Sequence, residues 1–172
     1  SRVLATSPVY VESSPFLAGL SNVSVVPIGV DTSRFSPGTG EEGDYFLFVG
    51  RFRAYKGIQV MLDAWSRLPD TRLVMVGSGP LDGEVRSRVE GEGLQVELAG
   101  TVDDTALLRL YRGARALVLP STHRSEAYGM VQLEAMACGA PVISTALDTG
   151  VRWVNRDEET GLIVPPGDPE AL

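Results

Sequence analysis

Short apolar segments alternate with helical patterns from about Val23 to the end of the chain, and this alternation constrains the fold more than any other feature. Several segments are continuous apolar runs, which is typical of parallel strands buried on both faces. The expected strands are 23–27, 45–49, 72–76, 96–99, 116–119 and 142–144. Such alternation predicts an α/β fold with a Rossmann-like, doubly wound parallel sheet. Ligands of these sheets bind outside the carboxyl ends of the strands.

The helices between these strands follow from apolar residues spaced three and four positions apart. One face of a helix collects the apolar residues of 58–68. A second helix begins behind a cap at Asp103 or Asp104, because an Asp side chain can accept from a free N–H group of the first turn. A third runs from Gly129 to Cys138 and stops at Gly139.

Bulk composition narrows the class of function. The 172 residues suit one globular domain, and 15 basic against 22 acidic side chains give a net charge of −7, which argues against a nucleic-acid partner. Any bound anion must therefore be held by locally placed cations. The one cysteine, Cys138, excludes an intrachain disulfide and fits a reducing compartment. The apolar runs are too short to span a bilayer and no signal peptide is recognisable, so we expect a cytoplasmic location.

Both ends of the chain suggest a piece of a longer protein. Segment 2–7 predicts a strand and 9–20 a helix, which look like the last unit of a preceding domain. At the other end, the residues of 166–170 predict a helix start with Asp168 as the N-cap, but the chain stops two residues later. We expect residues 1–28 to be the remnant of a preceding domain with an interdomain crossing. Residues 29–172 are then a domain truncated before its last helices.

The segment 125–143 carries the strongest chemical signal. It places Glu126 in a loop and Glu134 inside the helix that opens on Gly129. A helix start offers free N–H groups and a positive dipole, which suit a phosphate. Two carboxylates on either side of that start would bracket a ligand that has both phosphate and hydroxyl groups, as a nucleotide sugar does.

Two cations follow the strand 45–49. Gly50 lets the chain turn toward a ligand, and Arg51 and Lys56 stand in the loop behind it. A diphosphate leaving group needs two or more cations to stabilise its developing charge. We interpret this loop as a phosphate-binding loop.

The next strand ends in Gly77-Ser78-Gly79-Pro80. The pattern begins like a dinucleotide fingerprint but has Asp82 in place of the third glycine, so an NAD site is rejected. Two interpretations of the glycines remain open: room for a sugar or ribose against the backbone, or a plain turn from strand to helix.

Taken in order, these motifs resemble the C-terminal, donor-binding domain of the retaining glycosyltransferases of group 1, or GT4, which have the two-domain GT-B fold. The matching segments are 26–31, 49–51 with 56–57, 76–80, 99–104, 119–121, the pair Glu126 and Glu134, and 160–168. Each segment is weak alone, but seven in the right order over nearly the whole chain are specific. The sequence departs from the family pattern at Ile28, usually Asn, and at Tyr128, usually Phe.

The resemblance implies a role for each matching position. Arg51 and Lys56 would hold the donor diphosphate together with the backbone N–H groups of Met130 and Val131, and Glu134 would accept from the ribose hydroxyls. Glu126 would be the catalytic residue, facing the donor sugar and orienting it or stabilising positive charge at its anomeric carbon. The residues expected to border the base are Thr101, Val102 and Asp103, and those expected to border the sugar are Gly77, Gly79 and Gly129. Neither a metal nor another cofactor is expected, because the cations take the place of a metal.

The resemblance also implies an activity. The full-length protein would move a sugar from a nucleoside-diphosphate sugar to a glycan or lipid-linked acceptor held by a domain missing here, and the fragment alone would be inactive. Segment 148–155 resembles a branch that builds bacterial surface polysaccharides and includes mannosyltransferases, which points to GDP-mannose and to peripheral association with the inner face of the membrane. The alternatives are a nucleotide-sugar epimerase, a sugar phosphorylase of the same fold, or a non-catalytic nucleotide-sugar sensor.

Overall fold

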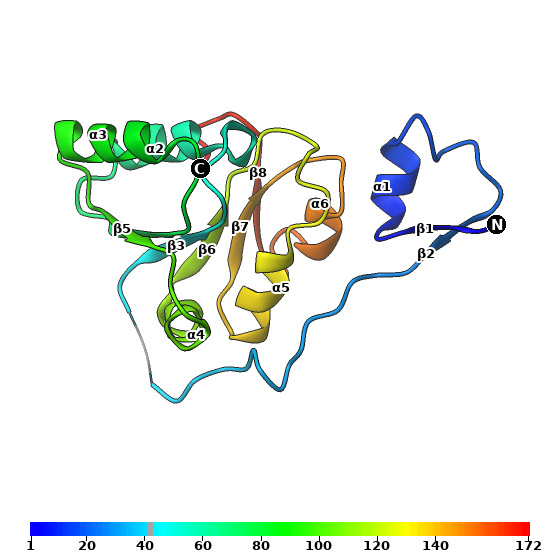
Figure 1. Cartoon of the computed structure of the whole chain (residues 1–172), viewed down its shortest axis with the longest axis horizontal. Coiled ribbons are helices and arrows are strands. Elements are labelled where there is room, and N and C mark those ends of the chain that lie inside the picture. Colours follow the sequence, from blue (N-terminus) through cyan, green and yellow to red (C-terminus); the bar gives the residue numbers. More distant parts are fainter. Residues whose placement is uncertain (41–42) are drawn as a thin grey trace.

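A computed structural model of the chain describes residues 1–40 and 43–172, and it confirms the predicted α/β architecture (Figure 1). In this part of the chain the main sheet has six parallel strands in the order β5-β4-β3-β6-β7-β8. The strands are β3 (Phe46–Val49), β4 (Leu73–Val76), β5 (Val96–Gly100), β6 (Ala116–Leu119), β7 (Val142–Thr145) and β8 (Gly161–Val164). Counted from β3, the order is that of a doubly wound sheet, and it reverses between β3 and β6. A ligand is therefore expected above the carboxyl ends of these two strands.

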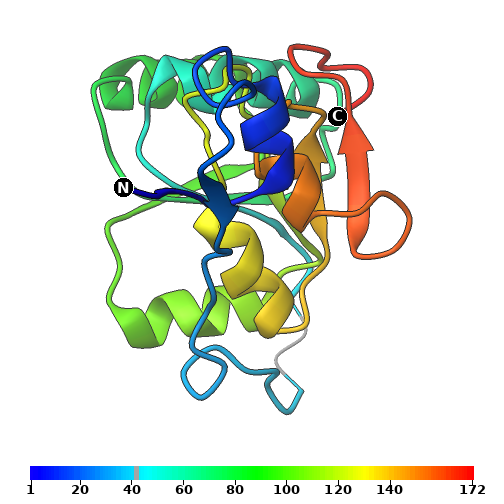
Figure 2. The same cartoon turned by 90° about the vertical axis from the view of Figure 1, so that its right-hand side faces the viewer.

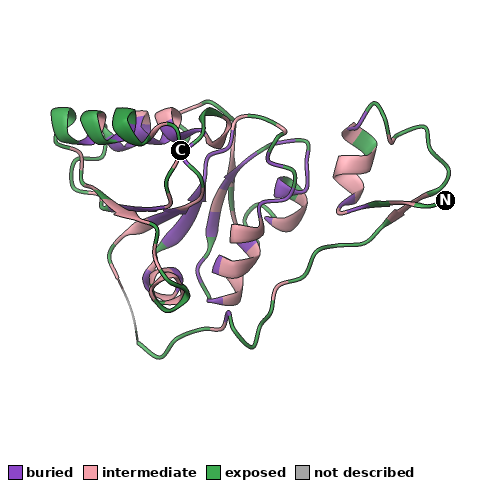
Figure 3. Ribbon diagram, viewed as in Figure 1, coloured by how far each residue is buried: buried purple, intermediate pink, exposed green. Residues whose placement is uncertain are grey.

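Helices cover both faces of the sheet, as Figures 1 and 2 show. The helices are η1 (Ala54–Lys56), α2 (Ile58–Trp65), α3 (Asp82–Glu92), α4 (Asp104–Gly113), α5 (Met130–Ala137) and α6 (Val151–Val154). Helices α2 and α3 lie on one face, and α4 and α5 lie on the other. Neighbouring strand residues serve opposite faces: Phe48 packs in the cluster with α2 and α3, whereas Leu47 packs in the cluster with Tyr111 of α4 and Ala135 of α5. The central strands are accordingly the most deeply buried part of the chain (Figure 3).

The predicted helix starts are confirmed where a cap could be read from the sequence. Asp103 caps α4, and its carboxylate accepts from the N–H of Ala106 at 2.8 Å. Gly129 precedes α5 in a left-handed conformation, with φ of 73°. Asp168 accepts from the N–H groups of Glu170 and Ala171 at 2.9 and 3.1 Å, as an N-cap does.

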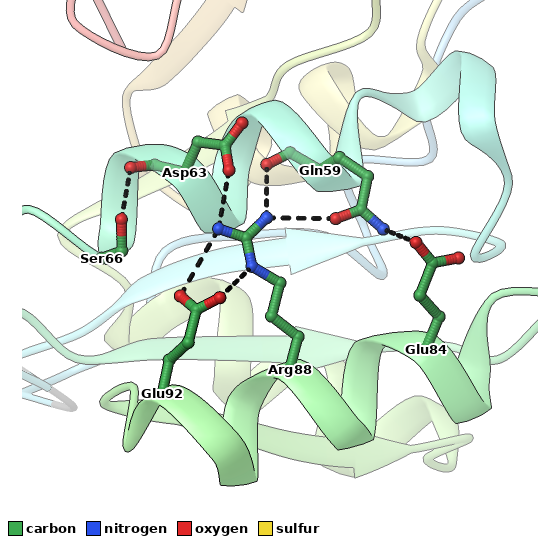
Figure 4. Close-up of polar contacts among 6 residues, drawn as sticks. All are labelled: Gln59, Asp63, Ser66, Glu84, Arg88 and Glu92. Carbon is green, nitrogen blue, oxygen red and sulfur yellow. Dashed lines mark hydrogen bonds and ion pairs between the residues drawn. The ribbon is translucent and has the colours of Figure 1, made fainter.

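Helix α3, whose apolar pattern is weak, is held to α2 by polar contacts (Figure 4). Arg88 of α3 donates to Glu92 on its own helix at 2.8 Å, forms an ion pair with Asp63 of α2 at 2.6 Å, and donates to the side chain of Gln59 at 3.1 Å. Hydrogen bonding to Glu92, followed by the interactions with Asp63, raises the pKa of the Arg88 guanidinium. A second link runs from Gln59 to Glu84 at 2.7 Å.

The first 28 residues form a small unit beside α6 (Figure 1). Strands β1 (Val3–Ala5) and β2 (Val23–Val25) pair in parallel, and α1 (Pro8–Ser13) connects them. The helix is shorter than the predicted 9–20, because Ser14 precedes Pro15 and takes an extended conformation. Within the described residues, four hydrogen bonds join this unit to the main domain. Ser13 Oγ donates to the carbonyl of Asp148, Arg124 donates to both the carbonyl and the hydroxyl of Ser13, and the hydroxyl of Tyr128 donates to the carbonyl of Ile28. The predicted domain boundary at residues 28 and 29 stays a prediction.

Candidate functional site

Most of the residues predicted for the site lie in loops or helix starts that follow the carboxyl ends of β3, β4, β5 and β6. The loop after β3 holds Arg51 and Lys56, and the loop after β6 holds Glu126. Because the sheet order reverses between β3 and β6, these two loops face each other. A backbone hydrogen bond ties them, from the N–H of Thr122 to the carbonyl of Tyr55 at 2.9 Å.

Lys56 and Glu126 form a buried ion pair across this junction. The Nζ atom of Lys56 lies 2.5 Å from Oε2 of Glu126, and the two side chains are only 11% and 9% exposed. The hydroxyl of Ser121, itself fully buried, donates to the same carboxylate oxygen at 3.0 Å. Within the described residues, Oε1 of Glu126 receives no hydrogen bond from the protein. The pair therefore places a fixed carboxylate and a shared cation at the point where a doubly wound sheet binds ligands.

The amino end of α5 lies directly after this loop. Gly129 is required there, because its φ of 73° is left-handed and a Cβ atom would lie 2.7 Å from Nε2 of Gln132. The N–H of Gln132 turns back to the carbonyl of Gly129 at 2.9 Å. The N–H groups of Met130 and Val131 are bound by no acceptor in 1–40 or 43–172. The helix start thus has two backbone donors free to bind an anion, and their role as phosphate ligands stays a prediction.

Glu134, on the second turn of α5, is bound by a residue that the sequence did not assign to the site. The hydroxyl of Tyr111 donates to Oε2 of Glu134 at 2.7 Å. Tyr111 is completely buried, and this desolvation, with the Glu134 charge, raises the pKa of its phenol far above the ordinary range. The phenol is therefore a permanent hydrogen-bond donor.

A cavity of about 370 Å³ opens beside the β3 loop, and five predicted residues line it. Arg51, Gly77, Gly79, Thr101 and Val102 come together there from the ends of three neighbouring strands. The close approach of backbones explains the first glycine: at φ of 124°, a Cβ atom on Gly77 would lie about 2.0 Å from the carbonyl oxygen of the β3 loop. The turn thus has a packing reason, and the same residues still border an open space.

The cavity lining excludes the ion pair, the α5 start and the predicted ribose ligand. Two residues of the cavity lining nevertheless lie near the ion pair and near Tyr111. A Cβ atom on Gly50, which lines the cavity, would lie 3.7 Å from Nζ of Lys56. Leu107, also in the lining, stands one helical turn before Tyr111, which binds Glu134. Asp103 is exposed at the α4 cap and is not part of the lining.

Sequence reasoning missed Ser121 and Tyr111. Ser121 was a motif position without a role, and its place after the end of β6 was the available signal. Tyr111 lies on the apolar face of α4, and this position gave no indication that its hydroxyl binds Glu134.

Among the described residues, no group of three or more His, Cys, Asp or Glu side chains is placed to hold a metal ion. The same residues include no helix of the length and hydropathy that a membrane crossing needs.

Comparisons with known proteins identify the family of the chain. The family model described as "Glycosyl transferases group 1" matches residues 29–172. The chain is 40% identical over 182 aligned positions to O-antigen chain mannosyltransferase C of Escherichia coli, covering 99% of this chain and 48% of that protein. It is 38% identical over 182 positions to D-rhamnosyltransferase WbpZ of Pseudomonas aeruginosa, with the same two coverages. The chain thus spans about half the length of these curated relatives.

A solved structure shows the same fold. Anabaena Alr3699/HepE in complex with UDP and glucose superposes with a TM-score of 0.86 at 20% identity. The superposition covers 99% of this chain and 51% of that one. It identifies the chain's architecture with one half of a GT-B protein.

Proposed function

The chain belongs to the group 1 glycosyltransferases, and on this premise we propose that it is the donor-binding half of a retaining enzyme. The full-length protein moves a sugar from a nucleoside-diphosphate sugar to a glycan or glycolipid acceptor, which the rest of the protein holds. GDP-mannose is the first donor to test, because the relatives include a mannosyltransferase and a rhamnosyltransferase. A lipid-linked acceptor would bring the full-length protein to a membrane surface on the cytoplasmic side.

The observation that carries this proposal is the meeting of Lys56 and Glu126 at the sheet reversal, beside the start of α5. An ammonium group has three N–H donors, so Lys56 can serve Glu126 and a phosphate oxygen together. Arg51 and the N–H groups of Met130 and Val131 supply the remaining diphosphate contacts. With these donors present, transfer is expected to proceed without a metal ion.

The two carboxylates have separate tasks in this proposal. Glu134 accepts from the ribose hydroxyls, while Glu126 faces the donor sugar and stabilises the positive charge that develops at the anomeric carbon. The cavity lined by Thr101 and Val102 borders the base, beside the exposed Asp103. Because Gly77, Gly79 and Gly129 have no side chain, the sugar and its phosphates can lie close to the backbone there. Closure of the missing domain over this surface excludes water and delivers the acceptor hydroxyl.

Calorimetric titration of the full-length protein tests donor binding. The ligands are GDP-mannose, UDP-glucose, UDP-GlcNAc and the bare diphosphates GDP and UDP. We expect one nucleotide sugar and its diphosphate to bind, and the isolated 172-residue chain to bind weakly and transfer nothing. Robust transfer by the isolated chain would contradict the division of labour, and the anomeric configuration of the product, read by NMR, tests retention.

The variant Glu126→Gln separates catalysis from binding. We expect it to bind the donor diphosphate within about threefold of the wild type and to lose transfer by about a hundredfold or more. Glu97→Gln is the matched control, since Glu97 pairs with Arg72 on the surface and should keep full activity. Unchanged transfer by Glu126→Gln would show that this carboxylate takes no part in the reaction, as in a sensor. Transfer that EDTA abolishes would contradict the metal-free mechanism.

A further inference from the structure

The bond between Tyr111 and Glu134 is a contact of the site that neither the sequence motifs nor the proposed roles explain. The phenol comes from the last turn of α4, and the carboxylate comes from the second turn of α5. The hydroxyl donates to Oε2 at 2.7 Å. The contact joins two helices on the same face of the sheet.

Tyr111 has little freedom to move. Its side chain is completely buried in the core beneath the sheet, and its ring meets the ring of Phe35 edge-on, with centroids 6.1 Å apart at 75°. A rigid, buried phenol holds its hydroxyl in one place, because rotation about the ring axis leaves the oxygen where it is. Glu134, only partly buried, takes its orientation from this anchor.

The bond leaves half of the carboxylate available. A carboxylate offers two oxygens with about four lone-pair sites, and the phenol uses one site on Oε2. In 1–40 and 43–172, no protein donor binds Oε1 of Glu134. One helical turn before Tyr111, on the same face of α4, Leu107 lines the cavity beside the β3 loop. Tyr111, which anchors the carboxylate, therefore shares a helix face with a residue of the cavity assigned to the base.

We propose that Tyr111 is a positioning residue that aims the free oxygen of Glu134 at the ribose hydroxyls and so makes the site selective for ribonucleotides. This inference rests on the proposed function, and it deepens it by naming what sets the sugar specificity of the nucleoside. A carboxylate that swings freely loses conformational entropy when it binds a hydroxyl pair, whereas one that is already aimed does not. The phenol therefore increases the affinity for ligands that have the 2′-hydroxyl.

The test measures binding of GDP, 2′-deoxy-GDP, UDP and 2′-deoxy-UDP to the full-length protein by calorimetry. For the base that binds, we expect the wild type to prefer the ribonucleotide by about tenfold or more, since a hydrogen bond to a charged group is lost in the deoxy form. Tyr111→Phe should reduce this preference at least threefold, through weaker binding of the ribonucleotide and little change for the deoxy form.

Tyr45→Phe is the matched control. Its hydroxyl donates to the carbonyl of Leu110 on the same helix at 3.0 Å, so the variant also removes a phenol contact to α4 but does not touch Glu134. It should leave the ribose preference within twofold of the wild type. Replacement of Tyr111 by 4-aminophenylalanine restores an N–H donor and should restore the preference, and it serves as the test variant if Tyr111→Phe does not fold.

The outcomes separate this inference from the proposed function. Ribonucleotide preference that Tyr111→Phe leaves unchanged, or an equal loss for both sugars, overturns the positioning role while donor binding stands. A wild type that binds neither diphosphate overturns the proposed function as well. In Glu134→Ala the preference should disappear, and adding Tyr111→Phe should change it no further, because the phenol acts through that carboxylate.

Discussion

The Lys56–Glu126 pair should stabilise the fold far more than an exposed ion pair of the same length. Opposite unit charges 2.5 Å apart attract by about 6–7 kcal/mol at an effective dielectric constant of about 20. Removing both groups from water offsets several kcal/mol of this attraction. Because both side chains are about nine-tenths buried, we expect a net coupling of about 2–3 kcal/mol.

A double-mutant cycle measures this coupling. The variants are Lys56→Met, Glu126→Gln and the double variant, and the assay is urea unfolding of the 172-residue chain, followed by tryptophan fluorescence and circular dichroism. Lys56→Met alone should be the most harmful, because the buried carboxylate is then left with Ser121 as its one donor among the described residues. The double variant should recover part of that loss.

The Arg72–Glu97 pair provides the control, since its N···O distance is also 2.5 Å but its side chains are 56% and 51% exposed. Its cycle, from Arg72→Met and Glu97→Gln, should give a coupling below about 1 kcal/mol. Equal couplings in the two cycles would refute the argument that burial, and not contact distance, decides the contribution of each pair.

Three further predictions test other parts of the structure. Gly129→Ala should lower the free energy of unfolding by about 1–3 kcal/mol, because its φ is left-handed and its Cβ would meet Leu119 at 2.8 Å; an unchanged melting temperature would contradict this. Arg88→Met should cost about 1 kcal/mol at low ionic strength and less in 1 M NaCl, since the ion pairs of Arg88 are partly exposed and therefore screened. Burial raises the pKa of the Cys138 thiol, so Ellman's reagent should modify it much more slowly in the folded chain than in urea at pH 8. The raised pKa also gives a stability contribution that is complete below the ordinary thiol pKa and is lost above about pH 8.5–9, so Cys138→Ala should show a flatter alkaline decline.

The sequence predicted the parts of the fold that depend on continuous patterns. Strands β4 and β6 are completely buried, and both were recognisable as uninterrupted apolar runs. Strand β8 was missed because its residues were interpreted as a motif, although Asn155 fastens it to β7 by donating to Ser144 and to the carbonyl of Leu162. Helix α1 was predicted too long because the effect of Pro15 on the residue before it was not weighed.

The candidate site was predictable as a set of residues but not as a set of contacts. Lys56 was assigned from its place behind a strand and Glu126 from its place before a helix start, yet their pairing depends on how two segments 70 residues apart meet. The periodicity of apolar residues does not predict which two loops come into contact. The same is true of Tyr111, whose place on the apolar face of α4 agrees with its burial but gives no sign of the carboxylate opposite its hydroxyl.

The ion pair also changes how an anion can be recognised on a chain with a net charge of −7. Lys56 already compensates Glu126, so it brings little uncompensated charge to a phosphate. Arg51 differs, because it is exposed at the cavity and forms no ion pair with any residue of 1–40 or 43–172. In the proposed site, uncompensated positive charge for a diphosphate therefore comes from Arg51 and from the dipole at the start of α5. Arg51→Met should accordingly weaken diphosphate binding more than Lys56→Met does, and the reverse order in a calorimetric titration would show that the ligand breaks the Lys56–Glu126 pair.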